Sequence, residues 1–277
     1  MGCRSAAIVL LPALALLACD AHESAGQPPD LAAALGTYRV VDLSHPFDDE
    51  TLYWPTSPSD FELEVLAAGE TEAGYYYSAN RFCTPEHGGT HLDAPIHFAA
   101  GGQDAAELPV EDLIAPAVVL DLSHEAAREP DYRLTREDVE RFEAAHGPIP
   151  AGSAVLLRTD WSQRWPDARA YLGDDTPGDA SDLHFPSFGV EAARLLVEER
   201  KVALLGIDTA SIDFGPSRDF PVHRIAARAD VAGLENLRRL HELPPRGAWL
   251  IALPLAVPGG SGGPVRAVAL VPQRSAP

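Results

Sequence analysis

The chain is predicted to form one α/β domain. Short apolar runs that are typical of buried strands recur along its 277 residues. Segments with helical periodicity lie between these runs, and strands interleaved with helices are typical of α/β domains. The length that remains after an apolar leader is sufficient for one large hydrophobic core.

Six apolar runs are the predicted strands of a largely buried sheet, at residues 39–43, 118–122, 154–157, 202–207, 249–253 and 265–270. Two segments, 135–145 and 190–201, are the predicted helices. In the first of them Thr135 is the expected N-cap and Gly147 the expected stop signal.

A cluster of ligand-type side chains lies between residues 87 and 97. It contains three imidazoles and one carboxylate: His87, His91, Asp93 and His97. Imidazole nitrogen together with carboxylate oxygen suits zinc, manganese or iron, whereas calcium and magnesium prefer oxygen and structural zinc is usually held by thiolates. The cluster therefore predicts a reactive metal site with a proton carrier beside it.

The local sequence predicts that this cluster lies on a loop that enters a strand. Glycine and proline cost about 1 and 3 kcal/mol in a helix interior, and both residue types interrupt this segment. On a strand His91 and Asp93 point to the same side, because side chains alternate with period two. The flexible pair Gly88-Gly89 then allows His87 to reach the same ion.

The segment resembles the signature H-x-G-T-H-x-D-x-P-x-H of the metal-dependent cyclase-like hydrolases, a family that includes bacterial kynurenine formamidases and isatin hydrolase. Every fixed position of the signature is matched. A second segment, with His223 and Glu235 twelve residues apart, resembles the downstream part of the same site, and the likeness extends from about Val41 to the end. The resemblance implies a swivelling β/β/α single domain with a mixed central sheet.

The resemblance also implies roles for individual residues. His87, His91 and Asp93 would bind a first metal, Asp93 would share a second metal with His223 and Glu235, and His97 would transfer protons. In the single-metal members of the family, His223 would instead face the substrate. The implied cofactor is zinc or manganese, as one or two ions, and the implied assembly is a homodimer or homotetramer.

The function predicted from the cluster is hydrolysis of a carbon–nitrogen bond in an amide, formamide or lactam. The resemblance makes N-formylkynurenine, hydrolysed to kynurenine and formate, the first substrate to consider, with an isatin-type lactam or a lactone as the alternative. The alternative to an enzyme is a non-catalytic lipoprotein that binds a metal or a small molecule without turnover. The presence of His97 argues against it, because binding alone needs no proton carrier.

The N-terminal residues predict export. Residues 1–18 carry one positive charge, at Arg4, and then an apolar run that is too short to span a membrane. A small residue before Cys19 resembles the lipobox of bacterial lipoproteins, so we expect a lipidated Cys19, a spacer within 19–36 and a domain at 37–277. The protein would then be membrane-anchored and face the periplasm or cell exterior. A plain signal peptide with a coincidental cysteine is the alternative.

The charge balance limits the partners. With 41 acidic against 21 basic residues, the formal charge is −20, which disfavours nucleic acid and anionic lipid. Membrane contact is therefore expected only through the lipid anchor, and the expected partner is a small-molecule substrate. If Cys19 is acylated, Cys83 has no cysteine partner, and we expect it to be a small buried apolar residue.

Three further features have more than one interpretation. Residues 259–263 match G-x-S-x-G, but prolines flank the motif and the next segment is predicted to be a strand rather than a helix, so Ser261 is not expected to be a nucleophile.

Asp208 and Asp213 would line the pocket or, more in keeping with their context, cap turns. Three aromatic residues near the cluster are predicted either to stack on substrate or to belong to the core: Tyr53, Trp54 and Phe98.

Overall fold

The computed structural model describes residues 30–273, so the predicted signal segment and Cys19 lie outside the described residues. Within that range no helix is both long and apolar enough to cross a membrane. The short helix α1 (Leu31–Leu35) lies in the segment that was predicted to be a spacer, and it precedes the first strand of the main sheet.

A nine-stranded mixed sheet forms the body of the molecule, in the order β1-β13-β11-β5-β7-β9-β10-β4-β12. The strands are β1 (Tyr38–Asp42), β4 (His91–Asp93), β5 (Ile114–Asp121), β7 (Ala154–Arg158), β9 (Leu204–Ile207), β10 (Ala232–Glu235), β11 (Ala248–Ile251), β12 (Gly262–Pro264) and β13 (Val268–Pro272). The four strands β5, β7, β9 and β10 are parallel, and antiparallel strands flank them. The prediction of a single α/β domain with a mixed sheet is confirmed.

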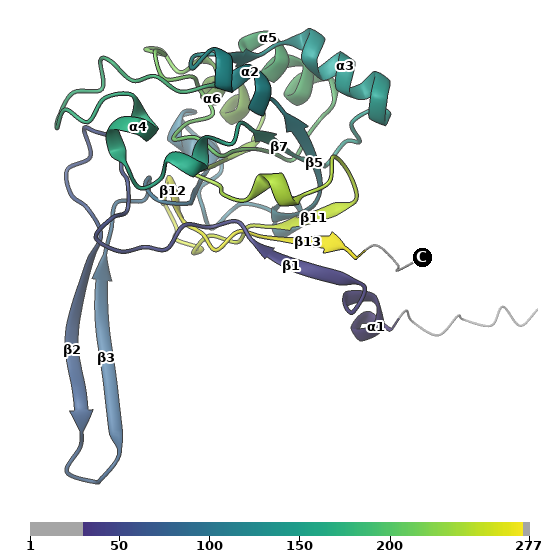
Figure 1. Cartoon of the computed structure of the whole chain (residues 1–277). Helices are drawn as coiled ribbons and strands as arrows, with labels where there is room; N and C mark the ends of the chain where they lie inside the picture. The colour runs from purple at the N-terminus through teal and green to yellow at the C-terminus, as the bar shows by residue number, and fades with distance from the viewer. Residues whose placement is uncertain (1–29, 274–277) are drawn as a thin grey trace, which may run out of the picture.

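Four helices cover one face of the sheet (Figure 1). They are α2 (Ser123–Arg128), α3 (Arg136–His146), α5 (Val190–Arg194) and α6 (Pro221–Arg228). Along β7, Val155 and Leu157 pack in the cluster beneath these helices, whereas Leu156 packs in the cluster on the opposite face. Both faces of the central strands are buried, which explains why they appear in the sequence as continuous apolar runs.

Most predicted elements have counterparts in the structure. Helix α3 begins after Thr135, which forms a capping box with Asp138, and ends at Gly147. The helix predicted at 190–201 is α5, followed by a π turn at Leu195–Glu199. Of the run 265–270, only residues 268–270 lie in a strand, β13, whereas Val265 forms an isolated bridge with Pro254 and β12 ends at Pro264.

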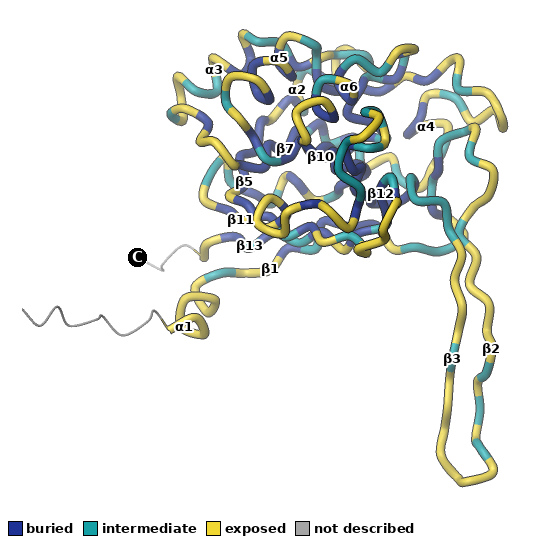
Figure 2. The backbone as a smooth tube through the Cα atoms, turned by 180° about the vertical axis from the view of Figure 1, so that it is seen from behind, coloured by how far each residue is buried: buried dark blue, intermediate teal, exposed yellow. Residues whose placement is uncertain are grey.

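The sequence reasoning missed a long hairpin and several short elements. The hairpin consists of β2 (Glu62–Glu70) and β3 (Tyr76–Cys83), and it projects from the body with most of its length exposed (Figures 1 and 2). The short elements include β6 (Arg133–Leu134), β8 (Ser187–Phe188) and α4 (Ala168–Leu172). The prediction that Cys83 is buried is wrong: the residue ends β3 in the hairpin and is exposed.

Asp208 gives the fold a testable pH dependence. The residue is buried, and its Oδ1 accepts hydrogen bonds from Thr159 N (2.9 Å) and Thr159 Oγ1 (2.6 Å). Burial outweighs these bonds and raises the pKa of Asp208 to about 7. The folded state therefore binds this proton more tightly than the unfolded state, so the stabilising effect is present at low pH and is lost as pH rises towards 7.

Asp208→Asn is expected to remove this pH-dependent component. When the pH is raised from 5 to 8, the free energy of unfolding of the wild-type protein should fall by about 2–3 kcal/mol more than that of the variant. The reason is that each pKa unit is worth about 1.4 kcal/mol. Urea unfolding of both proteins at the two pH values measures this difference. Equal changes in the two proteins would show that Asp208 does not titrate in this range.

Candidate metal centre

Residues from β4, β10, α4 and α6 line one cavity of about 260 Å³. Its wall includes all six residues that the sequence singled out: His87, His91, Asp93, His97, His223 and Glu235. The rest of the wall is mainly apolar and includes Leu52, Trp54, Phe98, Leu172 and Phe220. The structure thus brings together segments that are far apart in the chain.

The loop before β4 is held in place by the end of β10. The hydroxyl of Thr90 donates to the carbonyl of Asn236 (2.7 Å), and the side-chain amide of Asn236 donates to the carbonyl of Gly89 (2.7 Å). Gly89 has φ +55°, a conformation that glycine adopts without steric cost. This turn places His87 beside the strand that carries His91, as the glycine pair predicted.

Asp93 is the centre of the cluster. Its Oδ1 lies 2.6 Å from Nδ1 of His87 and 3.3 Å from Nε2 of His91, and its Oδ2 lies 3.2 Å from Nε2 of His223. The two oxygens of Glu235 lie 3.5 Å from Nε2 of His91 and 3.1 Å from Nε2 of His223. Three imidazoles therefore face two buried carboxylates.

The four separations of 3.1–3.5 Å fit neighbouring ligands of a metal ion, whereas the 2.6 Å between His87 and Asp93 is a hydrogen-bond distance. Two atoms that each lie about 2.1 Å from an ion are about 3.0–3.5 Å apart in octahedral or tetrahedral geometry. Two overlapping groups have ligand atoms within 4.8 Å of one another: His91, Asp93 and Glu235, and His87, Asp93 and His97. Asp93 belongs to both groups, which allows one ion or two.

The second ring nitrogen of each of three histidines has a hydrogen-bond partner. Nδ1 of His91 donates to a backbone carbonyl (3.0 Å), Nδ1 of His223 contacts the carboxylate of Asp213 (2.8 Å), and Nε2 of His87 contacts Oγ of Ser261 (2.8 Å). Histidines that ligate metals usually have such an outer partner, which orients the ring. The donor set therefore fits a divalent metal.

The charges in the cluster also fit a bound cation. Burial acts to raise the pKa of Asp93, but the surrounding histidines outweigh it and hold the pKa well below its usual range. Burial opposes protonation of His91, but Asp93 and Glu235 raise its pKa to about 9. Among the described residues that line the cavity there is no Lys or Arg, so protonated imidazoles or a metal must balance the carboxylates.

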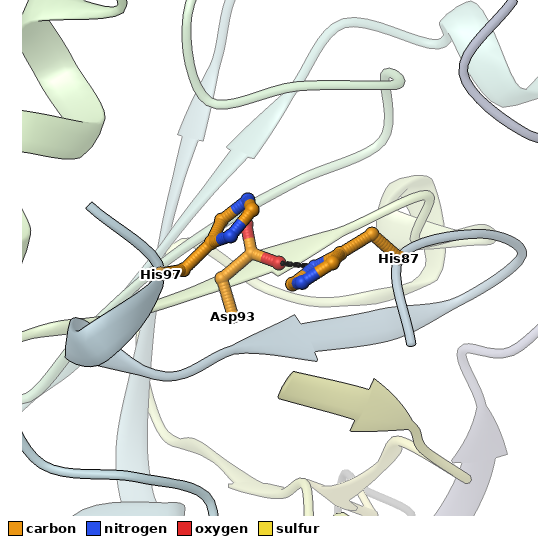
Figure 3. Close-up of side chains that lie close together, drawn as sticks. All are labelled: His87, Asp93 and His97. Carbon is orange, nitrogen blue, oxygen red and sulfur yellow. Dashed lines mark hydrogen bonds and ion pairs between the residues drawn. The ribbon is translucent and has the colours of Figure 1, made fainter. Parts of the chain in front are cut away.

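His97 differs from the other histidines of the cluster. Its ring stacks on His87, with 3.8 Å between the ring centroids. Figure 3 shows the two rings and the Asp93 carboxylate close together. Within residues 30–273 no hydrogen bond reaches its ring. Desolvation by the cavity wall outweighs the attraction of Asp93 and lowers the pKa of His97 to about 4, so the ring is neutral at pH 7 and can accept a proton.

The structure also places residues whose role the sequence left open. Asp213 caps α6, because its carboxylate accepts from the backbone N–H groups of Val222 and His223, and it also orients the ring of His223. Tyr53, Trp54 and Phe98 all line the cavity. Sequence reasoning missed the contact of Asp213 with His223, because it depends on how the turn before α6 folds.

Comparison with known proteins identifies the family. A family model described as "Putative cyclase" matches residues 41–214. An isatin hydrolase of Roseibium aggregatum is 37% identical over 231 residues, which cover 78% of this chain and 86% of that protein. A kynurenine formamidase of Salinibacter ruber is 30% identical over 233 residues, which cover 83% of this chain and 96% of that protein.

Solved structures agree with this result. A crystal structure of an isatin hydrolase bound to the product analogue thioisatinate has a TM-score of 0.80 at 34% identity and covers 88% of this chain and 97% of that chain. A structure described as a potential metal-dependent hydrolase with cyclase activity has a TM-score of 0.61 at 25% identity, with coverage of 86% and 100%. The chain belongs to the cyclase family of metal-dependent hydrolases.

Proposed function

We propose that the protein hydrolyses the carbon–nitrogen bond of a small neutral aromatic amide, with a lactam as the preferred form. The observation that carries the proposal is the neutral His97 beside a cluster of three imidazoles and two carboxylates at the base of an apolar cavity. A divalent ion held by the cluster would supply an activated water molecule and a Lewis acid for the substrate carbonyl.

The residues that line the cavity would bind the metal, transfer the proton and hold the substrate. His87, His91, Asp93, His223 and Glu235 would hold the ion or ions, and their nitrogen and oxygen donors suit zinc or manganese. His97 would take the proton from the attacking water and return it to the leaving nitrogen. Trp54 and Phe98 on the wall would stack on an aromatic ring and exclude water.

The lining of the cavity favours a lactam over N-formylkynurenine. N-formylkynurenine carries an amino-acid carboxylate, and a buried carboxylate needs a cationic or hydrogen-bonding partner. No described residue that lines the cavity is Lys or Arg, whereas the apolar wall suits a flat neutral molecule such as isatin. The similarity to isatin hydrolases over most of the chain supports the same choice.

A substrate panel tests this proposal. The domain is stripped with chelator, reloaded separately with zinc and manganese, and assayed with isatin, N-formylkynurenine, simple lactones and aryl amides. We expect metal-restored turnover, with a larger kcat/KM for isatin than for N-formylkynurenine. A preference for the formamide would contradict the lactam assignment. Tight metal binding without turnover of any compound would favour the metal- or ligand-binding protein.

We propose further that the hairpin β2–β3 packs against a second copy of the chain, in a homodimer or homotetramer. An isolated two-stranded hairpin is marginally stable in water, and a large exposed apolar surface usually marks an interface. The exposed apolar side chains of the hairpin include Leu63, Val65, Leu66, Tyr76, Tyr77 and Phe82. Leu63 and Phe82 lie directly opposite each other in the strand register.

The double substitution Leu63→Ser and Phe82→Ser is expected to convert the oligomer into monomers, because it removes the largest cross-strand apolar pair near the base of the hairpin. Light scattering coupled to size-exclusion chromatography measures the mass. Val110→Ser, which removes an exposed apolar side chain outside the hairpin, is the matched control and should leave the mass unchanged. A wild-type monomer, or an unchanged mass in the double variant, would contradict the proposed interface.

We also propose that Cys19 carries a lipid that anchors the exported protein to a membrane. The apolar leader and the small residue before Cys19 support this proposal. In a bacterial host the full-length protein should incorporate radiolabelled palmitate and partition with detergent, and Cys19→Ala should incorporate none. Equal incorporation of the label by the two proteins would contradict lipidation at this residue.

A further inference from the structure

The side chain of Ser261 lies between those of Glu86 and His87. Ser261 is the serine of the G-x-S-x-G motif at residues 259–263, where the flanking sequence argued against a nucleophile. Its Oγ is 2.5 Å from Oε2 of Glu86 and 2.8 Å from Nε2 of His87. The backbone N–H of Ser261 donates to the same oxygen of Glu86 at 3.0 Å. Glu86 therefore holds both the backbone and the hydroxyl of the serine.

The direction of these hydrogen bonds follows from an ionised Glu86. A carboxylate only accepts, so the single hydrogen of the Ser261 hydroxyl is donated to Glu86. Oγ must then accept from His87, which places the imidazole proton on Nε2 and leaves a lone pair on Nδ1. Nδ1 lies 2.6 Å from Oδ1 of Asp93, which is a hydrogen-bond distance that a shared proton bridges in the absence of a metal. In the metal-loaded site this lone pair would be the one that binds the ion.

Backbone packing keeps Ser261 in this position. Its carbonyl accepts from the backbone N–H of Ala94 at 2.8 Å, and Gly262 pairs with Asp93 across β12 and β4. A Cβ atom on Gly262 would lie 2.9 Å from Cε1 of His87 and even closer to the backbone of β4. Only glycine therefore allows β12 to approach closely enough for the serine to reach the imidazole.

His87 depends on this contact more than the other two histidines. Its side chain is 26% exposed, whereas the side chains of His91 and His223 are 4% and 7% exposed. All three rings line the cavity, but those of His91 and His223 are almost completely buried, whereas the ring of His87 is partly exposed. The ring of His87 is oriented by Asp93 at Nδ1, by Ser261 at Nε2 and by the stacked ring of His97.

We propose that Glu86 and Ser261 are positioning residues that fix the tautomer and orientation of His87, so that Nδ1 faces a divalent metal. The inference rests on the metal centre in the proposed function. It differs from a Ser-His-Asp triad, in which the serine hydroxyl donates to the imidazole. Here the hydroxyl donates to Glu86, and the serine has no proton directed at His87.

Metal affinity is the direct test, because it needs no substrate. Metal-stripped wild-type protein, Ser261→Ala and Glu86→Ala are titrated with zinc in competition with a chromophoric chelator. Each variant should bind zinc about 10–100-fold more weakly, which is the usual effect of losing an outer partner. Ser261→Thr keeps the hydroxyl and should restore the affinity, whereas Ser59→Ala and Glu111→Gln, at exposed positions, are the matched controls.

A second measurement uses only the wild-type protein and so does not depend on the folding of any variant. Long-range ¹H–¹⁵N correlation spectra of the zinc-loaded protein should show His87 protonated on Nε2. Protonation on Nδ1, or unchanged zinc affinity in both variants, would overturn the inference. If Ser261→Ala binds zinc as tightly as the wild type but has no turnover at full zinc occupancy, the serine takes part in the reaction itself instead. Failure of wild-type protein to bind zinc would contradict the metal centre itself.

Discussion

Asp93→Asn is expected to abolish metal binding and turnover together. Asp93 is the side chain that His87, His91 and His223 all face, at 2.6, 3.3 and 3.2 Å. Asn keeps the shape but removes the negative charge and one acceptor oxygen. Because loss of an outer partner alone costs about 10–100-fold in affinity, loss of this shared ligand should cost more than about 100-fold.

Metal content and hydrolysis rate, measured on the same preparation, check this prediction. Asp112→Asn, at an exposed position, is the control for a lost carboxylate and should behave like wild type. Circular dichroism verifies that the Asp93 variant is folded. If the folded variant retained a full metal complement and the wild-type rate, Asp93 would not be the shared ligand.

His97→Ala is expected to lower kcat by about 10²–10⁴-fold, the usual contribution of a positioned proton carrier, while metal affinity changes little. The pKa of His97 is lowered to about 4, so the imidazole is neutral at pH 7 and ready to accept a proton. Among the described residues none forms a hydrogen bond with its ring, unlike the rings of the three proposed ligands.

The same variant separates two roles for His97, because its ring lies close enough to His87 and Asp93 to act as a ligand. A proton carrier should lose rate at full metal occupancy, and added imidazole should restore part of that rate. A parallel loss of metal would instead make His97 a ligand. Unchanged turnover would contradict the proposed mechanism, and His124→Ala, at an exposed position on α2, is the control.

The sequence predicted those features that depend on local geometry. Period-two alternation placed His91 and Asp93 on one side of a strand, and the structure has both side chains on the cavity wall. The glycine pair predicted the turn that returns His87 to the cluster. The apolar runs of the central strands were equally clear, because both faces of the sheet are covered.

Other features depend on long-range pairing, and local sequence could not predict them. His223 and Glu235 lie far along the chain from Asp93, so only the family spacing placed them in the site. Ser261 reaches His87 because β12 pairs with β4, whereas the next strand, β13, pairs elsewhere in the sheet. The hairpin ending at Cys83 has both faces exposed, so it lacks the alternating pattern that marks a half-buried strand.

The central claim is that the cluster around Asp93 holds a divalent metal that hydrolysis requires. The most direct measurement is the rate of isatin hydrolysis during titration of metal-stripped protein with zinc or manganese, with bound metal measured at each point. We expect no turnover without metal, and a rate that rises with bound metal and saturates at one or two ions per chain. Full turnover by the stripped protein, or a filled site without turnover of any panel compound, would contradict the claim.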